Sequence, residues 1–407
     1  MERGKRNILL VLLIITFLVR LEMLPAVSRP FPDVDEQRYV EAAVRLVEQG
    51  YLAYNDSRPN AFVTPGYILF LAGLYLGKKV LALSWQQYLS LVFLAQAVLS
   101  TATAFLLYLL GERVWDERKA LVATAVFAFY PPAVAAAGRF MTEVLFSFFL
   151  LLTVFVFYQA FIRENSFLHG VAGALLALTT LIRPTPAPLL LLFYLKDGLT
   201  SLRRYFPYLL AAFLSFSLVM LPWWGRNYLL YHRFVPFSTE GGNPLLRGTD
   251  LYDPYDNIGP SVIANVPPDK WTETALRRIG EGLRKEPLRW LGWYTVGKFK
   301  ILWGQAWGYV PAWLNYRQTV YLHLVLVALG WAGLVRNWER KEGRLLALVP
   351  LYFTFVQLLF VPLGRYMFPV IPLMLLFAAD TLFTATAVLE KKGNFSLFFS
   401  ILRRRAG

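Results

Sequence analysis

The sequence predicts an all-α polytopic membrane protein with about ten transmembrane helices. The chain has 407 residues, of which 57% are hydrophobic, and its mean hydropathy is +0.46. Apolar runs of about 18 or more residues recur along it, and this is the length that a helix needs to cross a bilayer. The pattern is not the short alternating one of a membrane β-barrel. Between 9 and 12 spans fit the pattern, as one transmembrane domain over residues 1–407.

Ten candidate spans account for the apolar runs. The first follows Arg3, Lys5 and Arg6 and lacks a small-residue cleavage site, so we interpret it as a retained helix rather than a signal peptide. One run, Ala187–Leu195, is short for a span, so the count has a margin of one or two. The ten are Ile8–Pro25, Trp85–Leu110, Ala120–Ala136, Val144–Phe161, Phe167–Ile182, Ala187–Leu195, Pro207–Trp224, Val320–Val335, Leu345–Val361 and Tyr366–Phe383.

The distribution of basic residues explains the net charge of +15 and predicts the orientation. Predicted inner segments hold 19 of the 41 Lys and Arg residues, whereas the three short outer loops hold one each, Arg139, Arg183 and Arg365. This positive-inside bias predicts an inner or plasma membrane protein with both termini in the cytoplasm. It also removes the reason to infer nucleic-acid binding from the charge. Cysteine is absent, which excludes disulfides and thiolate chemistry.

Two extracytoplasmic loops, 26–84 and 225–317, are far too long to be simple turns, and long loops commonly carry function. In the first loop, Asp35–Gln49 has a helical apolar face and Gly50 follows it as a stop signal. The next apolar stretch, Ile68–Gly77, is too short to span and predicts a second surface or re-entrant helix.

The second loop and the C-terminal tail predict further surface segments. Trp271–Lys285 is expected to form a surface helix, and Arg289–Val310 an interfacial one because it carries Lys298 and Lys300 in its middle. The basic tail, residues 390–407, is expected on the anionic inner leaflet.

An acidic cluster follows the first span. Asp33, with Glu36 three residues later, fits a capping box, which is the structural interpretation of these acids. That interpretation does not explain the adjacent carboxylates Asp35 and Glu36 where the span leaves the bilayer. A carboxylate there could act as general base for an acceptor hydroxyl, or hold a metal.

Glu143 begins the fourth span and has the same two interpretations, a helix cap or a second active-site carboxylate. A divalent cation held by Asp35, Glu36 and Glu143 therefore stays an open alternative. The three histidines form no metal-spaced pair.

Four arginines stand alone at outer helix ends: Arg139, Arg183, Arg226 and Arg365. Each by itself would be an interfacial anchor. Four on one side, facing two acidic loops, predict an anionic ligand, because guanidinium groups bind phosphate bidentately. No Walker loop or dinucleotide motif is present, so a soluble nucleotide donor is unsupported.

The motifs, in their order against the spans, resemble those of membrane glycosyltransferases of the C superfamily. The resemblance is to bacterial relatives of protein O-mannosyltransferases and of lipid A aminoarabinose transferases. The residues that carry it are Asp35-Glu36-Gln37-Arg38-Tyr39, Met141-Thr142-Glu143, Leu181-Ile182-Arg183-Pro184, Pro222-Trp223-Trp224-Gly225-Arg226-Asn227-Tyr228, Phe237-Ser238-Thr239-Glu240-Gly241-Gly242 and Arg365-Tyr366-Met367-Phe368-Pro369.

This resemblance implies transfer of a hexose or pentose from a polyprenyl-phosphate donor to a lipid, glycan or protein acceptor in the cell envelope, with inversion. It assigns Asp35 as the base, Glu36 as a supporting acid and Glu143 to the second acidic motif. The expected phosphate-binding residues are Arg139, Arg183, Arg226, Arg365 and Tyr366.

A transporter or lipid flippase is the alternative function, and a non-catalytic scaffold is a third. Transporters place ionisable groups near the bilayer midplane and often contain inverted repeats. Here the charges gather at the predicted outer helix ends and no repeat is visible, which favours the transferase.

Overall fold

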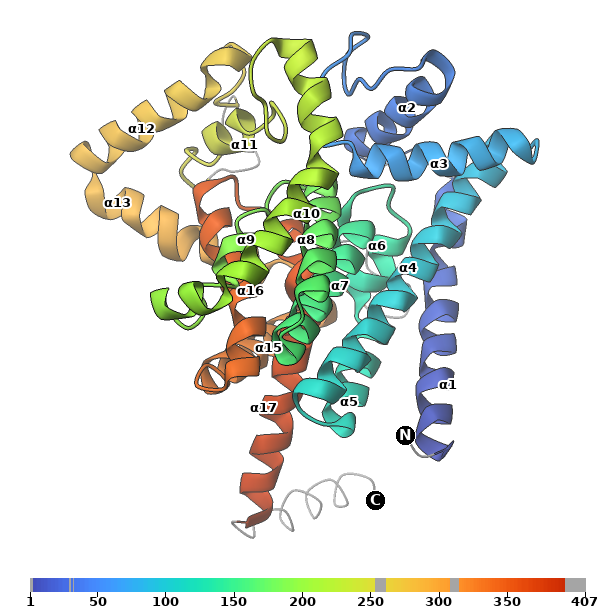
Figure 1. Cartoon of the computed structure of the whole chain (residues 1–407), viewed down its shortest axis with the longest axis vertical. Helices are drawn as coiled ribbons and strands as arrows, with labels where there is room; N and C mark the ends of the chain where they lie inside the picture. Colours follow the sequence, from blue (N-terminus) through green and yellow to red (C-terminus); the bar gives the residue numbers. More distant parts are fainter. Residues whose placement is uncertain (1–2, 29–30, 32, 253–260, 308–314, 392–407) are drawn as a thin grey trace.

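The structure is a computed structural model that describes residues 3–28, 31, 33–252, 261–307 and 315–391. All regular structure within these residues is helical, as the sequence predicts. Figure 1 shows one bundle in which the start of α1 and the end of α17 lie at the bottom. The short helices of the two long loops lie at the other end, which we call the loop end.

Six stretches of the described chain are long and apolar enough to cross a membrane, or seven if one bent pair counts as a span. They belong to α1 (Arg3–Arg20), α4 (Trp85–Val114), α7 (Glu143–Arg163), α10 (Leu199–Tyr231), α15 (Tyr316–Arg336) and α17 (Ile371–Lys391). The bent pair is α5 (Glu117–Phe129) and α6 (Pro131–Ala137), which meet at 57°.

The predicted number of ten spans is not confirmed. Two further predicted spans correspond to helices α8 (Ser166–Ile182), which has 17 residues, and α16 (Lys341–Leu359), and neither is among the six. The predicted span Ala187–Leu195 contains only the single-turn helix α9 (Leu189–Leu192).

Proline explains why this segment is irregular. Pro184, Pro186 and Pro188 lack the N–H that a helix needs, so the chain turns repeatedly here. The segment still passes from the loop end, where Arg183 contacts Glu143, to the opposite end, where Asp197 contacts Arg344. Its residues Leu189 and Phe193 are fully buried, and irregular backbone is tolerated at membrane depth when protein surrounds it.

Small residues allow the long helices to pack closely. α8 and α10 form the most extensive helix pair, followed by α15 and α17. A Cβ on Gly173 of α8 would lie 2.0 Å from the carbonyl oxygen of Ala212 in α10. A Cβ on Gly333 of α15 would lie 2.2 Å from that of Phe377 in α17. Glycine at these two positions is therefore what lets the backbones touch.

The loop end is built from short helices whose bounds agree well with the predictions. The predicted surface helices correspond to α2 (Val34–Gln49), α3 (Gly66–Val80) and α12 (Trp271–Lys285), and the loops add α11 (Gly242–Arg247), α13 (Pro287–Gly292) and α14 (Lys298–Gly304). Short 3-10 or π turns complete the chain at Leu21–Ser28, Pro268–Lys270, Trp293–Gly297, Gly364–Tyr366 and Phe368–Val370. Residues 308–314 of the predicted interfacial segment and 392–407 of the predicted tail lie outside the described residues.

Two buried cations close helix ends inside the protein. Arg20 is fully buried and donates to the carbonyls of Phe127 and Ala128, where α5 ends at its bend. Lys298 donates from Nζ to the carbonyls of Leu358 and Phe360, both at 2.9 Å, where α16 ends. A cation at a helix C-terminus satisfies carbonyls that lack an intrahelical partner. Burial lowers the pKa of Lys298 to about 7, whereas its hydrogen bonds to the two carbonyls favour the protonated form.

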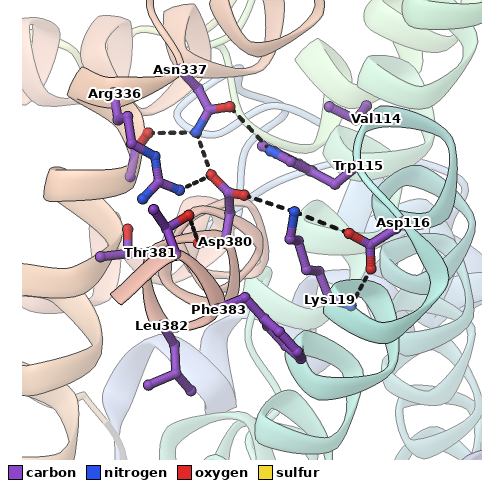
Figure 2. A network of polar contacts seen from close by, with 12 residues as sticks. Val114, Trp115, Asp116, Lys119, Arg336, Asn337, Asp380, Thr381, Leu382 and Phe383 are labelled. Atoms are coloured by element: carbon purple, nitrogen blue, oxygen red, sulfur yellow. Dashed lines mark hydrogen bonds and ion pairs between the residues drawn. The ribbon is translucent and has the colours of Figure 1, made fainter. Parts of the chain in front are cut away.

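A polar cluster around Asp380 joins the helices at the end opposite the loops, and Figure 2 shows its contacts. The Asp380 carboxylate of α17 contacts Arg336, Asn337 Nδ2 at 2.7 Å and Lys119 Nζ at 3.2 Å. Trp115 Nε1 in turn donates to Asn337 Oδ1 at 3.1 Å. These contacts join α15 and α17 to the turn between α4 and α5. The cluster is an internal brace, because Arg336 pairs with Asp380 and Lys119 pairs with both Asp380 and Asp116.

We predict that Arg20→Met destabilises the protein. It would leave the α5 carbonyls without a donor, at a cost of about 1–3 kcal/mol for each unsatisfied buried group. Thermal unfolding of the purified protein in detergent should show a lower midpoint. Arg118→Met, at an exposed position of the same helix α5, is the matched control and should leave the midpoint nearly unchanged. Equal midpoints for the two variants would contradict this role of Arg20.

Candidate active site

The first turn of α2 positions the acidic cluster. Asp33 caps the helix, and its Oδ1 accepts from the backbone N–H of Asp35 at 2.9 Å. Gly50 ends the helix with a φ of +80°, the left-handed conformation that glycine adopts most readily. The predicted capping role of Asp33 is confirmed. The predicted capping box is wrong, because Glu36 turns away from the helix end toward other partners.

Asp35 stands between a tyrosine and two arginines. Its Oδ1 accepts from the Tyr54 hydroxyl at 2.9 Å and lies 3.8 Å from Arg38 Nη1. Its Oδ2 lies 3.5 Å from Arg365 Nη2. The side chain keeps 34% of its surface exposed, so a second molecule can reach the carboxylate.

Arg365 follows α16 in the short turn that leads into α17. Its guanidinium reaches Asp35 and also lies 4.0 Å from Asp33 Oδ2. It stands over the ring of the neighbouring Tyr366, at 5.5 Å from the ring centre. Sequence positions 35 and 365 are thus brought together from opposite ends of the chain.

Glu36 and Arg139 form a separate, more deeply buried pair. Glu36 is 1% exposed, its Oε1 lies 2.5 Å from Arg139 Nε, and its Oε2 accepts from the backbone N–H of Phe140 at 3.0 Å. Burial raises the pKa of the Glu36 carboxyl, and the charge of Arg139 opposes part of that rise. This pair fastens α2 to the turn between α6 and α7, and Glu36 does not face the cavity that Asp35 lines.

Glu143 and Arg183 form the third pair. Glu143 begins α7 and is 1% exposed, and its Oε1 accepts from Arg183 Nη2. Arg183 Nε donates to the Thr142 hydroxyl at 2.6 Å, and its guanidinium lies over the rings of Phe146 and Tyr366. Arg183, unlike Glu143, lines the cavity.

Arg226 lies apart from the other three predicted arginines. It is in α10, where Nη2 donates to the carbonyl of Leu52 at 3.0 Å and the guanidinium stacks on Trp223. It lines neither of the cavities that Asp35 lines. Its contacts hold the first loop against α10. The sequence predicts that Arg226 binds phosphate, whereas these contacts are structural.

Two cavities meet at Asp35 and Arg365. The first, of about 210 Å³, is lined by these two residues together with Arg183, Glu240, Tyr366 and other side chains of both loops. The second, of about 400 Å³, is lined by Asp35 and Arg365 with Asp33, Gln305, Trp307 and Tyr316. One acid and one arginine therefore have access to two separate spaces.

Glu240 and Tyr54 are cavity residues to which the sequence reasoning gave no role. Glu240 lies in the turn-rich stretch of the second loop, and Tyr54 in the first loop. Burial and the nearby Asp35 raise the pKa of Glu240 to about 7, although Arg365 and Arg183 oppose the shift. The sequence could have indicated Glu240 as a site residue, because it is an acid next to two glycines in one of the motifs. Nothing in the sequence predicts the contact between Tyr54 and Asp35.

The three predicted metal ligands do not fit a shared cation site. Glu36 is committed to Arg139 and Glu143 to Arg183, so neither carboxylate is directed at Asp35. No group of three or more His, Asp or Glu side chains placed to hold a metal occurs within the described ranges. We therefore derive no step through a metal.

Comparisons with known proteins agree with this fold. A family model described as dolichyl-phosphate-mannose-protein mannosyltransferase matches residues 62–224. The archaeal oligosaccharyltransferase AglB from Archaeoglobus fulgidus, solved with an inhibitory peptide and a dolichol-phosphate, superimposes with a TM-score of 0.59. The two share 15% identity over 98% of this chain and 52% of that chain.

A bacterial structure is similar to the same extent. ArnT from Cupriavidus metallidurans, bound to undecaprenyl phosphate, superimposes with a TM-score of 0.58 at 14% identity, over 94% of this chain and 60% of that chain. The chain spans about half the length of the archaeal oligosaccharyltransferases. No curated protein sequence matched.

The fold and the site together define a multi-pass membrane protein with charged residues gathered at one end of the bundle. Residues 62–224 are thus similar to the mannosyltransferase family, and the fold of the chain is similar to the folds of AglB and ArnT.

We predict that Glu36 and Arg139 couple strongly in stability. A double-mutant cycle with Glu36→Gln and Arg139→Met should give a coupling of about 1–3 kcal/mol, because breaking one partner leaves a buried charge unpaired. The same cycle on the exposed pair Glu164 and Arg204 should give less than about 1 kcal/mol. Unfolding midpoints in detergent provide the measurement, and equal couplings would argue against the structural role of Glu36.

Proposed function

We propose that this protein transfers a sugar from a polyprenyl-phosphate-linked donor to a hydroxyl group of a lipid, glycan or protein acceptor. The transfer takes place at the loop end of the bundle, on the extracytoplasmic face, and inverts the anomeric carbon. The observation that carries the proposal is the meeting of two cavities at Asp35 and Arg365.

The first cavity suits the donor's phosphate and sugar. Arg183 and Arg365 both line it, and guanidinium groups stabilise a phosphate that gains charge as it leaves. Its volume of about 210 Å³ is below the range of about 300–1,000 Å³ that is usual for small-molecule pockets. A cavity of this size favours a single sugar ring over an oligosaccharide. The similar structures of AglB and ArnT contain a dolichol-phosphate and an undecaprenyl phosphate, respectively.

The second cavity gives the acceptor a path to the same carboxylate. Asp35 faces it, and Trp307 and Tyr316 offer aromatic surfaces for a sugar or lipid. An acceptor hydroxyl at Asp35 would lie opposite the donor, which is the arrangement that an in-line displacement needs.

The reaction then follows from the charges. Asp35 accepts the proton of the acceptor hydroxyl, and the oxygen forms a bond to the anomeric carbon of the sugar. The bond between that carbon and the phosphate oxygen breaks, and polyprenyl phosphate leaves with the electron pair. Arg365 and Arg183 neutralise the developing charge. A single displacement inverts the configuration at the carbon.

Orientation follows from the positive-inside bias. The basic residues Arg118 and Lys119, at the start of α5, and Arg340 and Lys341, at the start of α16, lie opposite the loop end. Basic short loops favour the cytoplasm. The site at the loop end would then face outward, where a lipid-linked donor replaces a nucleotide one.

We predict that Asp35→Asn lowers turnover by about 10²–10⁴-fold, the usual contribution of a general base. The assay is release of polyprenyl phosphate from a panel of polyprenyl-phosphate sugars by the purified protein. Asp56→Asn, which removes an exposed carboxylate of the same loop, should keep wild-type turnover. Wild-type turnover in a folded Asp35→Asn variant would refute the base assignment.

Arg365→Ala should weaken binding of undecaprenyl phosphate by about tenfold or more, the value of one charge-assisted hydrogen bond. Arg365→Lys keeps the charge without the planar fork and should give an intermediate loss. Arg233→Ala, an exposed arginine in the loop after α10, is the control. If titration of the lipid gives the same Kd for Arg365→Ala and wild type, Arg365 is not part of the phosphate site.

A further inference from the structure

Glu240 is a cavity carboxylate without a partner in the protein. It lines the first cavity, yet in the part of the chain that the structure describes no side chain forms an ion pair or a hydrogen bond with its carboxylate. The other acids of the site differ in this respect. Asp35 is paired with Arg365, Glu36 with Arg139 and Glu143 with Arg183.

The backbone fixes Glu240 in place. Thr239 N–H donates to the carbonyl of Ala61 at 2.8 Å, and Glu240 N–H donates to that of Phe62 at 3.2 Å. The Glu240 carbonyl accepts from Asn243 N–H at 2.8 Å, at the start of α11. These backbone hydrogen bonds therefore fix the position of Glu240 beside the cavity, where the two long loops pair.

Burial and the neighbouring charge of Asp35 make the ionised form of Glu240 unfavourable. Asp35 repels the Glu240 carboxylate, while Arg183 and Arg365 attract it but already contact Glu143 and Asp35. Burial raises its pKa to about 7 from an ordinary value of 4.5. A raised carboxyl pKa means that folding is favoured when the group is protonated, so this group's contribution to stability is lost as the pH rises toward and through 7.

We propose that Glu240 binds the transferred sugar, by accepting a hydrogen bond from a hydroxyl or ammonium group on its ring. The inference rests on the proposed function, since it names which part of the donor this wall of the cavity contacts. A carboxylate repels the phosphate, so the phosphate belongs at Arg183 and Arg365 and the sugar at Glu240. Glu240 does not bind the acceptor, because it lines the first cavity and not the second.

A ring hydroxyl or ammonium group would give the half-buried Glu240 carboxylate a hydrogen-bond donor, which no described side chain gives it. The same contact discriminates between sugars, because an analogue without a donor group at that position leaves the carboxylate unpaired. Glu240 would thus set which sugar is accepted, while Asp35 carries out the proton transfer.

The test compares lipids with and without a sugar on the purified full-length chain. The probes are undecaprenyl phosphate, undecaprenyl-phosphate mannose and an undecaprenyl-phosphate-linked amino sugar. Wild type should bind at least one sugar-bearing lipid more tightly than undecaprenyl phosphate. Glu240→Ala should weaken binding of that lipid by about tenfold, and Glu240→Gln by less because its amide oxygen still accepts a hydrogen bond. Both variants should bind undecaprenyl phosphate within twofold of wild type.

The controls separate the possible results. Glu281→Gln, at an exposed position on α12, should match wild type with every probe. Glu240→Gln should unfold at the same or a higher temperature than wild type at pH 8, because it removes the unpaired charge. A larger loss for the amino sugar than for mannose identifies an ammonium partner, and equal losses identify a hydroxyl.

Two results would overturn the inference in distinguishable ways. If Glu240→Ala binds the preferred sugar-bearing lipid as tightly as wild type does, Glu240 is not a sugar ligand and the donor-phosphate site still stands. If wild type binds none of the three lipids, the proposed function fails and this inference fails with it.

Discussion

The pairing of buried carboxylates with partly exposed arginines from other elements is the interaction on which the loop end depends. Glu36 with Arg139 and Glu143 with Arg183 join α2, α7 and the end of α8, and both carboxylates are only 1% exposed. Such pairs persist because each charge would be costly alone in a medium of low dielectric constant. The third pair, Asp35 with Arg365, differs in its carboxylate, which is 34% exposed, and it alone of these three borders both cavities. The scaffold pairs thus hold an accessible pair at the point where two substrates could meet.

Local signals in the sequence predicted the elements that local chemistry determines. Asp33 and Gly50 marked the ends of α2, and the bounds of α12 agree with the predicted surface helix Trp271–Lys285. Elements governed by distant contacts were predicted less well. The segment around α9 is apolar and is therefore predicted as a span, but its prolines prevent a regular helix, and its burial makes the irregular path acceptable. Glu36 left the predicted capping box because Arg139, more than 100 residues away in sequence, is a stronger partner.

The site was predicted in part for the same reason. Outer-end placement predicts Arg183 and Arg365 as phosphate-binding residues. Both line one cavity with Asp35, and their phosphate-binding roles stay predictions. The same placement gives Arg226 the same prediction, although its guanidinium donates to the Leu52 carbonyl. A hydrogen bond to a backbone carbonyl cannot be predicted from composition or motif spacing. Glu240 required knowledge of how the two loops pair, and that pairing consists of backbone hydrogen bonds that any residue type could form.

In the proposed mechanism Asp35 acts on the acceptor while Arg365 binds the donor phosphate, so that the phosphate competes with Asp35 for the guanidinium. The most direct measurement is the affinity of Asp35→Asn for undecaprenyl phosphate, determined beside its turnover. Removing a negative charge from the phosphate site should leave that affinity equal or higher while turnover is lost. A fall in affinity as large as the fall in turnover would contradict the account, because Asp35 would then hold the site together rather than carry out the chemistry.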